Sequence, residues 1–185
     1  MTDWTIEPCY TQIMANPIAI FGTTSEEFSN KVIELRKAIR SEEYDNVSDQ
    51  MYTIPHLTLA FNNNFNSSDF EKAKEIVTAT LLGQSKFTIT VKAFIIMENN
   101  IAALFDNSFT NEFAKRVSQK LEPLGFEVVQ TDHMRLIRSE VKEEFHEIVR
   151  KMVNQELPRE IEINGIAMAG KLLRKEDLLW NISLA

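Results

Sequence analysis

One pattern occurs twice in this chain and limits the folds that it can adopt. A short run of β-forming residues begins with a histidine, and a capped amphipathic helical segment follows it. The runs start at His56 and His133, 77 positions apart (133 − 56), and the helical segments begin near Ser68 and Ser139. Because this spacing is close to half a domain, we expect two duplicated units related by a pseudo-twofold axis.

Hydrophobic periodicity and turn residues predict the other elements. A capping box at Thr24 to Glu27 opens a first helix, and a polar loop follows at 41–53. A third helix is expected from Ser108 to Leu121. Extended runs are expected at 17–21, 87–97, 101–105, 126–130, 160–170 and 178–184, with a hairpin turn at 98–100 and a charged turn at 171–177. Strands outnumber β-α-β crossovers, so the pattern favours an α+β fold over a doubly wound sheet.

Length and composition are those of one globular domain. The chain has 185 residues, of which 44% are hydrophobic and 25% charged, so we expect residues 1–185 to form a single domain built from two lobes. Twenty Lys and Arg against 27 Asp and Glu give a net charge of −7. That acidity argues against an extended nucleic-acid groove, because it would repel a long polyanion.

Targeting signals are also informative. The single cysteine, Cys9, cannot form a disulfide within the chain, which suits a reducing compartment. The first residues include Asp3 and Glu7 rather than basic residues and an apolar run, and no stretch of eighteen apolar residues occurs. We therefore expect a cytoplasmic protein without a membrane segment, and the sequence does not predict an oligomeric state.

The two histidine strands place polar groups on one face. Side chains alternate along a strand, so His56, Thr58 and Ala60 should share a face opposite Leu57, Leu59 and Phe61. In the second run, the same alternation puts His133, Arg135 and Ile137 opposite Met134 and Leu136. If the two units oppose these faces, the two imidazoles meet across a cleft with Thr58 and Arg135 between them.

Two facing imidazoles can act as a general acid and a general base. An imidazole with a pKa of about 6.5 is present in both forms near neutrality, so one can deprotonate an attacking oxygen while the other protonates the leaving oxygen. A hydroxyl and a guanidinium would hold the nonbridging oxygens of a phosphoryl group. A metal site is not expected, because the three histidines fall on separate elements without H-x-x-x-H spacing. The G-x-x-x-x-G-K-[ST] and G-x-S-x-G motifs are absent from the sequence.

These residues resemble a known family. The run from Pro55 to Phe61 resembles the first H-x-[ST]-x motif of the two-histidine (2H) phosphoesterase superfamily, the LigT-like and cyclic-phosphodiesterase proteins, and Asp132 to Leu136 falls where the second motif should. The resemblance implies a bilobal α+β fold with two antiparallel sheets lining a central cleft and helices outside. It also implies a hydrolase without a cofactor, acting on 2′,3′-cyclic phosphates, 2′,5′-linked oligonucleotides such as 2′,5′-oligoadenylate, or related ends in RNA processing. His56 and His133 would be catalytic, and Thr58 would bind phosphate.

The second motif departs from the family pattern, and three interpretations stay open. Arg135 stands where the family has Thr or Ser, so the arginine either clamps phosphate from a longer side chain or fills the cleft. In the first interpretation the chain is a phosphodiesterase, and in the second it is a catalytically impaired protein that keeps the cleft and uses Arg135 to retain a nucleotide or phosphorylated ligand. In the third, the repeated pattern is accidental and the chain is a structural or interaction domain. Which histidine is acid and which is base is also open.

Overall fold

The computed structural model of the chain describes residues 17–45, 54–170 and 178–185. Helices and strands alternate irregularly along these residues, as the α+β prediction requires. The strands are β1 (Ile18–Thr24), β2 (His56–Asn62), β3 (Phe87–Met97), β4 (Asn100–Phe105), β5 (Glu127–Val128), β6 (His133–Arg138), β7 (Glu160–Ala169) and β8 (Leu178–Ser183). The α-helices are α1 (Glu26–Ser41), α2 (Phe70–Thr80), α3 (Ser108–Leu121) and α4 (His146–Glu156).

All eight strands belong to one antiparallel sheet. Its order is β5-β2-β1-β7-β3-β4-β6, and β8 pairs with β7. The two predicted sheets are continuous because β3 has two partners: Phe87 pairs with Ile163 of β7, while Ile96 pairs with Ile101 of β4. Although β2 and β6 lie near opposite ends of this order, they contact each other, so the sheet curls toward itself.

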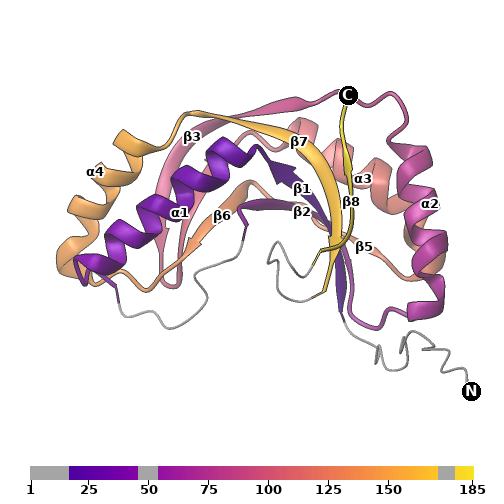
Figure 1. The fold of residues 1–185 in the computed structure, drawn as a ribbon, viewed down its shortest axis with the longest axis horizontal. Coiled ribbons are helices and arrows are strands. Elements are labelled where there is room, and N and C mark those ends of the chain that lie inside the picture. Colours follow the sequence, from indigo (N-terminus) through magenta and orange to yellow (C-terminus); the bar gives the residue numbers. More distant parts are fainter. Residues whose placement is uncertain (1–16, 46–53, 171–177) are drawn as a thin grey trace, which may run out of the picture.

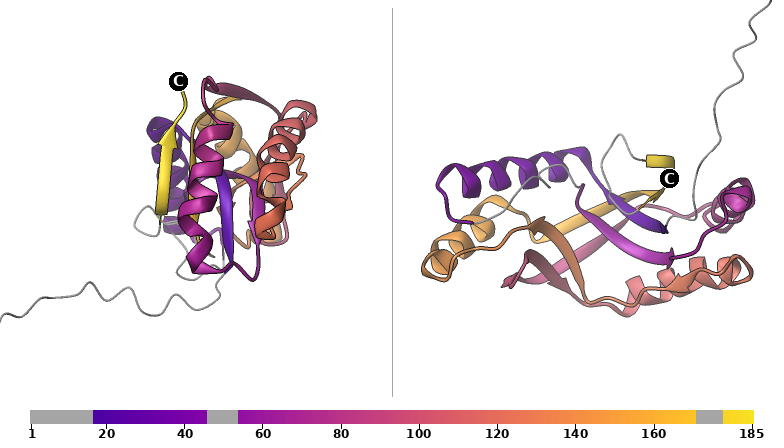
Figure 2. Two further views of the ribbon diagram at one scale, coloured as in Figure 1. Left: turned by 90° about the vertical axis from the view of Figure 1, so that its right-hand side faces the viewer. Right: turned by 90° about the horizontal axis from the view of Figure 1, so that it is seen from below.

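The helices form two pairs at the two ends of the molecule. Helices α2 and α3 contact each other, and α3 lies against β2 and β5. Helices α1 and α4 form the other pair, with α4 against β3 and α1 against β6. Figure 1 shows one pair on each side of the sheet, with β2 and β6 between them, and the view from below in Figure 2 shows the same division. The helix pairs therefore define the two expected lobes.

The core is one apolar cluster to which both motif strands contribute. Leu57 and Leu59 of β2 and Met134 and Leu136 of β6 are buried in it. The hairpin prediction is confirmed, since β3 and β4 pair antiparallel, and α3 has the predicted bounds. Burying these side chains supplies the main driving force for the fold. The predicted turn at 171–177, most of the polar loop at 41–53, and Cys9 lie outside the described residues.

The predicted capping residues of the first two helices are wrong by one or two positions. Ser25, not Thr24, caps α1, and its hydroxyl accepts a hydrogen bond from the amide of Phe28 at 3.2 Å. Thr24 belongs to β1, where its hydroxyl lies 3.0 Å from that of Ser29. Before α2, the side chain of Asn66 accepts from the amide of Ser68 and caps a short 3₁₀ turn. Several adjacent residues could cap each helix, and the final choice depends on where the preceding strand ends.

The predicted start of the fourth helix, near Ser139, is also wrong. Ser139 is fully buried and donates a hydrogen bond to Asp45 at 2.6 Å instead of capping a helix, and α4 begins at His146. The core face of α4 consists of Val149 and Val153, while Ile148 is 46% exposed. A 3₁₀ turn at 143–145 lies between Ser139 and the start of α4.

Candidate active site

A β-bulge in β2 separates the polar motif residues from the rest of the strand. Ile20 of β1 pairs with Ala60, but the next residue, Phe21, pairs with Thr58, so Leu59 is the extra residue. The bulge inverts the alternation of side chains, and Leu59 and Ala60 are both buried. The prediction that Ala60 shares a face with His56 and Thr58 is therefore wrong, and Phe61 is only partly buried rather than part of the core.

A second bulge lies at the matching position of β6. Ile101 of β4 pairs with Ile137, whereas Ala102 pairs with Arg135, so Leu136 is the extra residue. Leu136 and Ile137 are both buried, and the prediction that Ile137 shares the face of His133 is wrong for the same reason. Each bulge falls three residues after a motif histidine, so each strand keeps two polar side chains off the core face.

The structure brings His56 and Arg135 into each other's electrostatic environment. His56 and Thr58 are partly buried, His133 is partly exposed and Arg135 is exposed, while their strand neighbours Leu57 and Met134 point to the core. Strands β2 and β6 contact each other, and the guanidinium of Arg135 acts on the pKa of His56. The two motif strands, remote in sequence, therefore lie beside each other at a seam between β2 and β6 (Figure 1).

The surroundings of His56 favour the neutral imidazole. Its Nδ1 lies 2.7 Å from the carbonyl oxygen of Ile54, which can only accept, so Nδ1 carries the proton and Nε2 keeps a lone pair. Burial is the main cause that lowers the pKa of His56. The Ile54 hydrogen bond opposes this effect, and the positive charge of Arg135 makes the smallest contribution, which also lowers the pKa. The ring of Phe21 packs edge-on against the imidazole, with 4.7 Å between the two ring centres, and restricts rotation of the imidazole.

The surroundings of His133 contain an anion instead. Its Nδ1 lies 3.1 Å from Oδ1 of Asp132, and 42% of its side chain is exposed. The hydrogen bond to His133 is the main cause that holds the pKa of the Asp132 carboxyl below its usual range, so this carboxyl is ionised at neutral pH. The two histidines thus have similar strand positions and opposite electrostatic environments.

Sequence reasoning missed the residues that fix the two imidazoles. Asp132 stands directly before His133, and an acidic residue adjacent to a motif histidine is a signal that the sequence offers. Phe21 lies in β1, opposite Thr58, and no local pattern distinguishes it from an ordinary core residue. The Ile54 carbonyl is a backbone group, which no side-chain pattern could have found.

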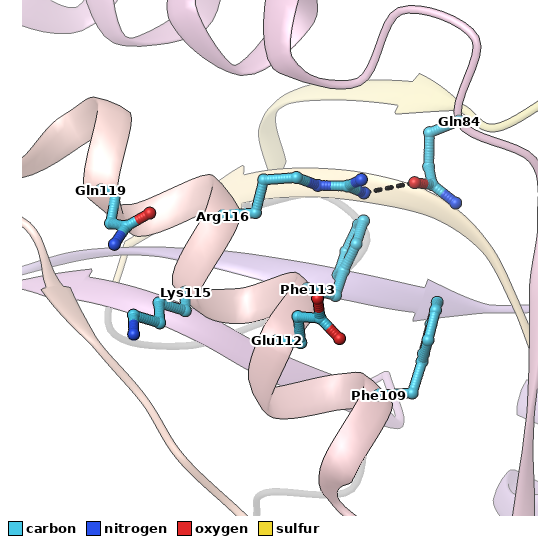
Figure 3. Close-up of a pocket in the computed structure, with 7 residues that line it drawn as sticks. All are labelled: Gln84, Phe109, Glu112, Phe113, Lys115, Arg116 and Gln119. Atoms are coloured by element: carbon cyan, nitrogen blue, oxygen red, sulfur yellow. Dashed lines mark hydrogen bonds between the residues drawn. The ribbon is translucent and has the colours of Figure 1, made fainter.

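A hollow of about 500 Å³ lies elsewhere, beside helix α3 (Figure 3). Its lining comes from α3 and the segment after α2: Gln84, Phe109, Glu112, Phe113, Lys115, Arg116 and Gln119. Arg116 donates a hydrogen bond to the side chain of Gln84, and its guanidinium lies 5.1 Å from the ring centre of Phe113. None of the predicted site residues lines this hollow, so it is distinct from the β2–β6 seam.

Two further properties concern the described residues alone. Within ranges 17–45, 54–170 and 178–185, no group of three His, Cys, Asp or Glu side chains is arranged to hold a metal ion. No helix in the same part of the chain is long and apolar enough to cross a membrane.

Comparisons with known proteins connect this fold to phosphoesterases. Neither a family model nor a curated protein matches the chain. Among solved structures, it is similar to a phosphoesterase, with 12% identity and a TM-score of 0.59 over 92% of this chain and 99% of that one. It is also similar to E. coli LigT in complex with 3′-AMP, with 10% identity and a TM-score of 0.56 over 92% and 98%.

A third structure extends the likeness to a yeast protein. Usb1 of Kluyveromyces marxianus, solved with uridine monophosphate, is 10% identical with a TM-score of 0.50 over 92% of this chain and 98% of that one. At these identities the likeness concerns the fold. The chain therefore has the α+β fold of LigT-like phosphoesterases, as the motif resemblance implied.

Proposed function

We propose that this protein is a phosphodiesterase that acts on a small nucleotide or the end of a short RNA, by acid–base catalysis with His56 and His133. The substrate carries a 2′,3′-cyclic phosphate or a 2′,5′ linkage, and the reaction uses no cofactor. The observation that carries the proposal is the contact between β2 and β6, with the charge of Arg135 acting on His56. An accidental pattern gives no reason for two histidine-bearing strands, remote in sequence, to lie beside each other.

The nature of the ligands in similar structures supports the choice of substrate. E. coli LigT has been solved with 3′-AMP, with phosphate, with ATP and with NADP⁺, and the yeast Usb1 with uridine monophosphate. A nucleotide carries the phosphate that two histidines, a hydroxyl and a guanidinium are chemically suited to bind. The net charge of −7 favours a short substrate over a long polyanion.

His56 acts as the general base in this proposal. Its Nδ1 proton is held by the Ile54 carbonyl, so Nε2 is the atom that accepts a proton from the attacking oxygen. Burial and the charge of Arg135 lower its pKa, which keeps the imidazole neutral and able to accept at neutral pH. His133 acts as the general acid in this proposal, because its Nδ1 donates to the carboxylate of Asp132 at 3.1 Å, which leaves Nε2 as the atom that gives a proton to the leaving oxygen.

The same groups serve both substrates. With a 2′,3′-cyclic phosphate, His56 takes a proton from water, the water oxygen bonds to phosphorus, and His133 protonates the ribose oxygen as its bond to phosphorus breaks. With a 2′,5′ linkage, His56 takes the proton of the adjacent 3′-hydroxyl. That oxygen attacks phosphorus to form a cyclic phosphate, and His133 protonates the leaving 5′-oxygen.

Thr58 and Arg135 bind the nonbridging oxygens of the phosphate. The Thr58 hydroxyl lies on the same side of β2 as His56, two residues along the strand. Arg135 brings a permanent positive charge to the site, which offsets the negative charge that grows on phosphorus-bound oxygens in the transition state. The guanidinium of Arg135 therefore binds phosphate in place of the Thr or Ser hydroxyl that the family has at this position.

The test uses purified wild type, His56→Ala and His133→Ala. Each is incubated with 2′,3′-cyclic nucleotides and with 2′,5′-oligoadenylate in the presence of a chelator, and products are separated by chromatography. We expect turnover by wild type on one substrate class and a loss of at least about a hundredfold in each variant, the scale of a general acid or base. Glu156→Gln, at the end of α4, is the matched control with an unchanged site.

Two results would reject the proposal. Binding of a nucleotide by wild type without any turnover would instead support a ligand-binding protein that retains its ligand through Arg135. If wild type neither binds nor turns over any of these substrates, the result would support the interpretation as a structural or interaction domain.

A further inference from the structure

The proton of His133 Nδ1 is fixed by its neighbours. Nδ1 lies 3.1 Å from Oδ1 of Asp132 and 3.3 Å from Oγ1 of Thr131. Thr131 donates its hydroxyl hydrogen to the carbonyl of His133 at 2.8 Å, so toward the imidazole this oxygen can only accept. Both groups near Nδ1 are therefore acceptors, and Nδ1 must be the donor. The atom left for chemistry is Nε2.

The turn that carries these acceptors is held from two elements. The side chain of Asn111 in α3 accepts a hydrogen bond from the amide of Thr131 at 3.1 Å. The amide of Phe105, the last residue of β4, donates to the carbonyl of Asp132 at 2.9 Å. The amide of His133 donates in turn to the Thr131 hydroxyl at 3.2 Å. Asp132 is thus anchored through its backbone before any ligand binds.

We propose that Asp132 is a positioning residue that holds His133 through Nδ1 and presents Nε2, with its proton, to the leaving oxygen. This inference rests on the proposed function and adds to it a residue outside both motif triplets. The carboxylate fixes the ring orientation and the tautomer, so that Nε2 is the atom aimed at the leaving oxygen. Once Nε2 has given its proton to the leaving oxygen, Nδ1 keeps its own proton and its bond to Asp132.

The charges around His133 agree with this role. Strand β4, which pairs with β6, contains no titratable side chain, and the only one in β2 is His56. From α1, the guanidinium of Arg36 reaches the carbonyl of Leu136 on the core side of β6. Arg135 lies two residues along the same strand and acts on His56. Asp132 therefore supplies a negative charge to His133, whereas His56 meets a neutral carbonyl and a cation.

The test compares Asp132→Ala and Asp132→Asn with wild type. The alanine variant removes both the acceptor and the charge, while the asparagine variant keeps a carbonyl acceptor that can still hold Nδ1–H. Because Asp132 is exposed and water screens its charge, we expect a modest loss of about three- to tenfold in kcat for the alanine variant, with little change in KM. The asparagine variant should regain part of the loss. Glu156→Gln removes one exposed carboxylate at the end of α4, which makes no hydrogen bond with the turn, and should match wild type.

A second readout does not depend on activity. At pH 8.5, ¹⁵N NMR of the imidazoles should show His133 with its proton on Nδ1 in wild type, and a shift toward the Nε2 tautomer in Asp132→Ala. The carboxyl ¹³C titration of Asp132 should have a pKa below the usual range, and His133→Ala should raise it toward that range.

The two hypotheses fail in different ways. An unchanged tautomer in Asp132→Ala, or a kcat equal to that of wild type, would overturn the role of Asp132 and leave the phosphodiesterase proposal standing. Absence of turnover in wild type would reject the proposed function, and the NMR measurements would still decide whether Asp132 holds His133.

Discussion

At the scale of single residues, the site depends on two imidazoles whose surroundings differ. His56 donates to a backbone carbonyl and packs edge-on against the ring of Phe21, whereas His133 donates to a carboxylate at the surface. Arg135 connects the two motifs, because it belongs to the second strand and acts on the histidine of the first. Each residue therefore has a consequence that can be measured separately.

Replacing Arg135 tests whether the guanidinium has a role of its own. We expect Arg135→Thr, which restores the usual motif residue, to lower kcat/KM by more than about tenfold, equivalent to roughly 1.4 kcal/mol of transition-state stabilisation. The reason is that a hydroxyl is shorter and carries no charge to offset that of the phosphate. Arg135→Lys should retain more activity than Arg135→Thr, because lysine keeps the positive charge. If Arg135→Thr turns over substrate as fast as wild type, the guanidinium has no role beyond that of the usual hydroxyl.

Protonation of His56 should make stability depend on pH. Burial lowers the pKa of His56 in the folded protein. At a pH below the ordinary histidine pKa of about 6.5, His56 is therefore protonated more often in the unfolded chain than in the folded protein. The free energy of unfolding should therefore decrease as pH falls from about 6.5 toward the pKa of the folded state. Urea unfolding at pH 7.5, 6.5 and 5.5 measures this decrease, and His56→Gln should flatten it.

The comparison with His56→Gln isolates the contribution of His56, because every other titratable group is the same in the two proteins. The carboxyls of Asp106 and Asp132 also have lowered pKa values, but they titrate below the ordinary aspartate value of about 3.9. An equal slope in wild type and His56→Gln between pH 7.5 and 5.5 would contradict the role of His56 burial.

At the scale of elements, the strands beside the motif strands fix where the polar residues lie. Gly165 of β7 pairs with Thr23, which in turn pairs with His56 across β1 and β2. A Cβ at Gly165 would lie 2.6 Å from the hydroxyl oxygen of Thr23 and 3.0 Å from the carbonyl oxygen of Ile182. The small residue lets three strands approach each other next to the first motif.

Gly165→Ala should therefore destabilise the protein by about 1–3 kcal/mol, as overpacking does. Chemical denaturation of the variant measures the loss. Gly170→Ala is the control, since a Cβ there meets only the carbonyl of Pro17, at 3.9 Å, and should change stability by less than about 0.5 kcal/mol. Equal stability of the two variants would contradict the close approach at Gly165.

Arg36 joins a helix to the bulge in the second motif strand. It is 4% exposed, and its Nη2 donates to the carbonyl of Leu136, the extra residue of the bulge, at 3.1 Å. Arg36→Ala should lower the free energy of unfolding by about 2–3 kcal/mol, because a buried carbonyl loses a charged donor. Arg40→Ala, on the exposed side of α1, should change it by less than about 0.5 kcal/mol. A loss no larger than that of Arg40→Ala would contradict this role.

These elements also show what the sequence could predict. Strand and helix positions follow from hydrophobic periodicity, and the hairpin between β3 and β4 and the full extent of α3 were predicted from it. The bulges at Leu59 and Leu136 were not, because a bulge depends on the register of the neighbouring strand and leaves no pattern in its own sequence. The motif residues His56, Thr58, His133 and Arg135 came from local sequence. Asp132 could have been inferred from its position before His133, whereas Phe21 required the three-dimensional contacts.

At the scale of the whole molecule, the pairing of β3 with both β7 and β4 makes two lobes into one sheet. Apolar residues from both lobes belong to one core cluster. We therefore expect a single cooperative unfolding transition rather than separate unfolding of the lobes.

Two probes test this cooperativity. In a Trp4→Phe variant, the fluorescence of Trp180 reports on β8, which pairs with β7, while far-UV circular dichroism reports on all helices. Their midpoints in urea should coincide. Two separated transitions would contradict the view of the sheet as one cooperative unit.

The curl of the sheet has a further consequence. Strand pairing connects β2 to β6 through β1, β7, β3 and β4. Strands β2 and β6 also contact each other directly, because the sheet curls. A ligand that contacts both β2 and β6 would link the two ends of this series of paired strands. Binding would then also reduce the motion of strands that the ligand does not contact, and this ordering would lower the affinity. Deuterium exchange at the β7–β3 pairing should then slow on binding, and mutations there should change how long the ligand stays bound.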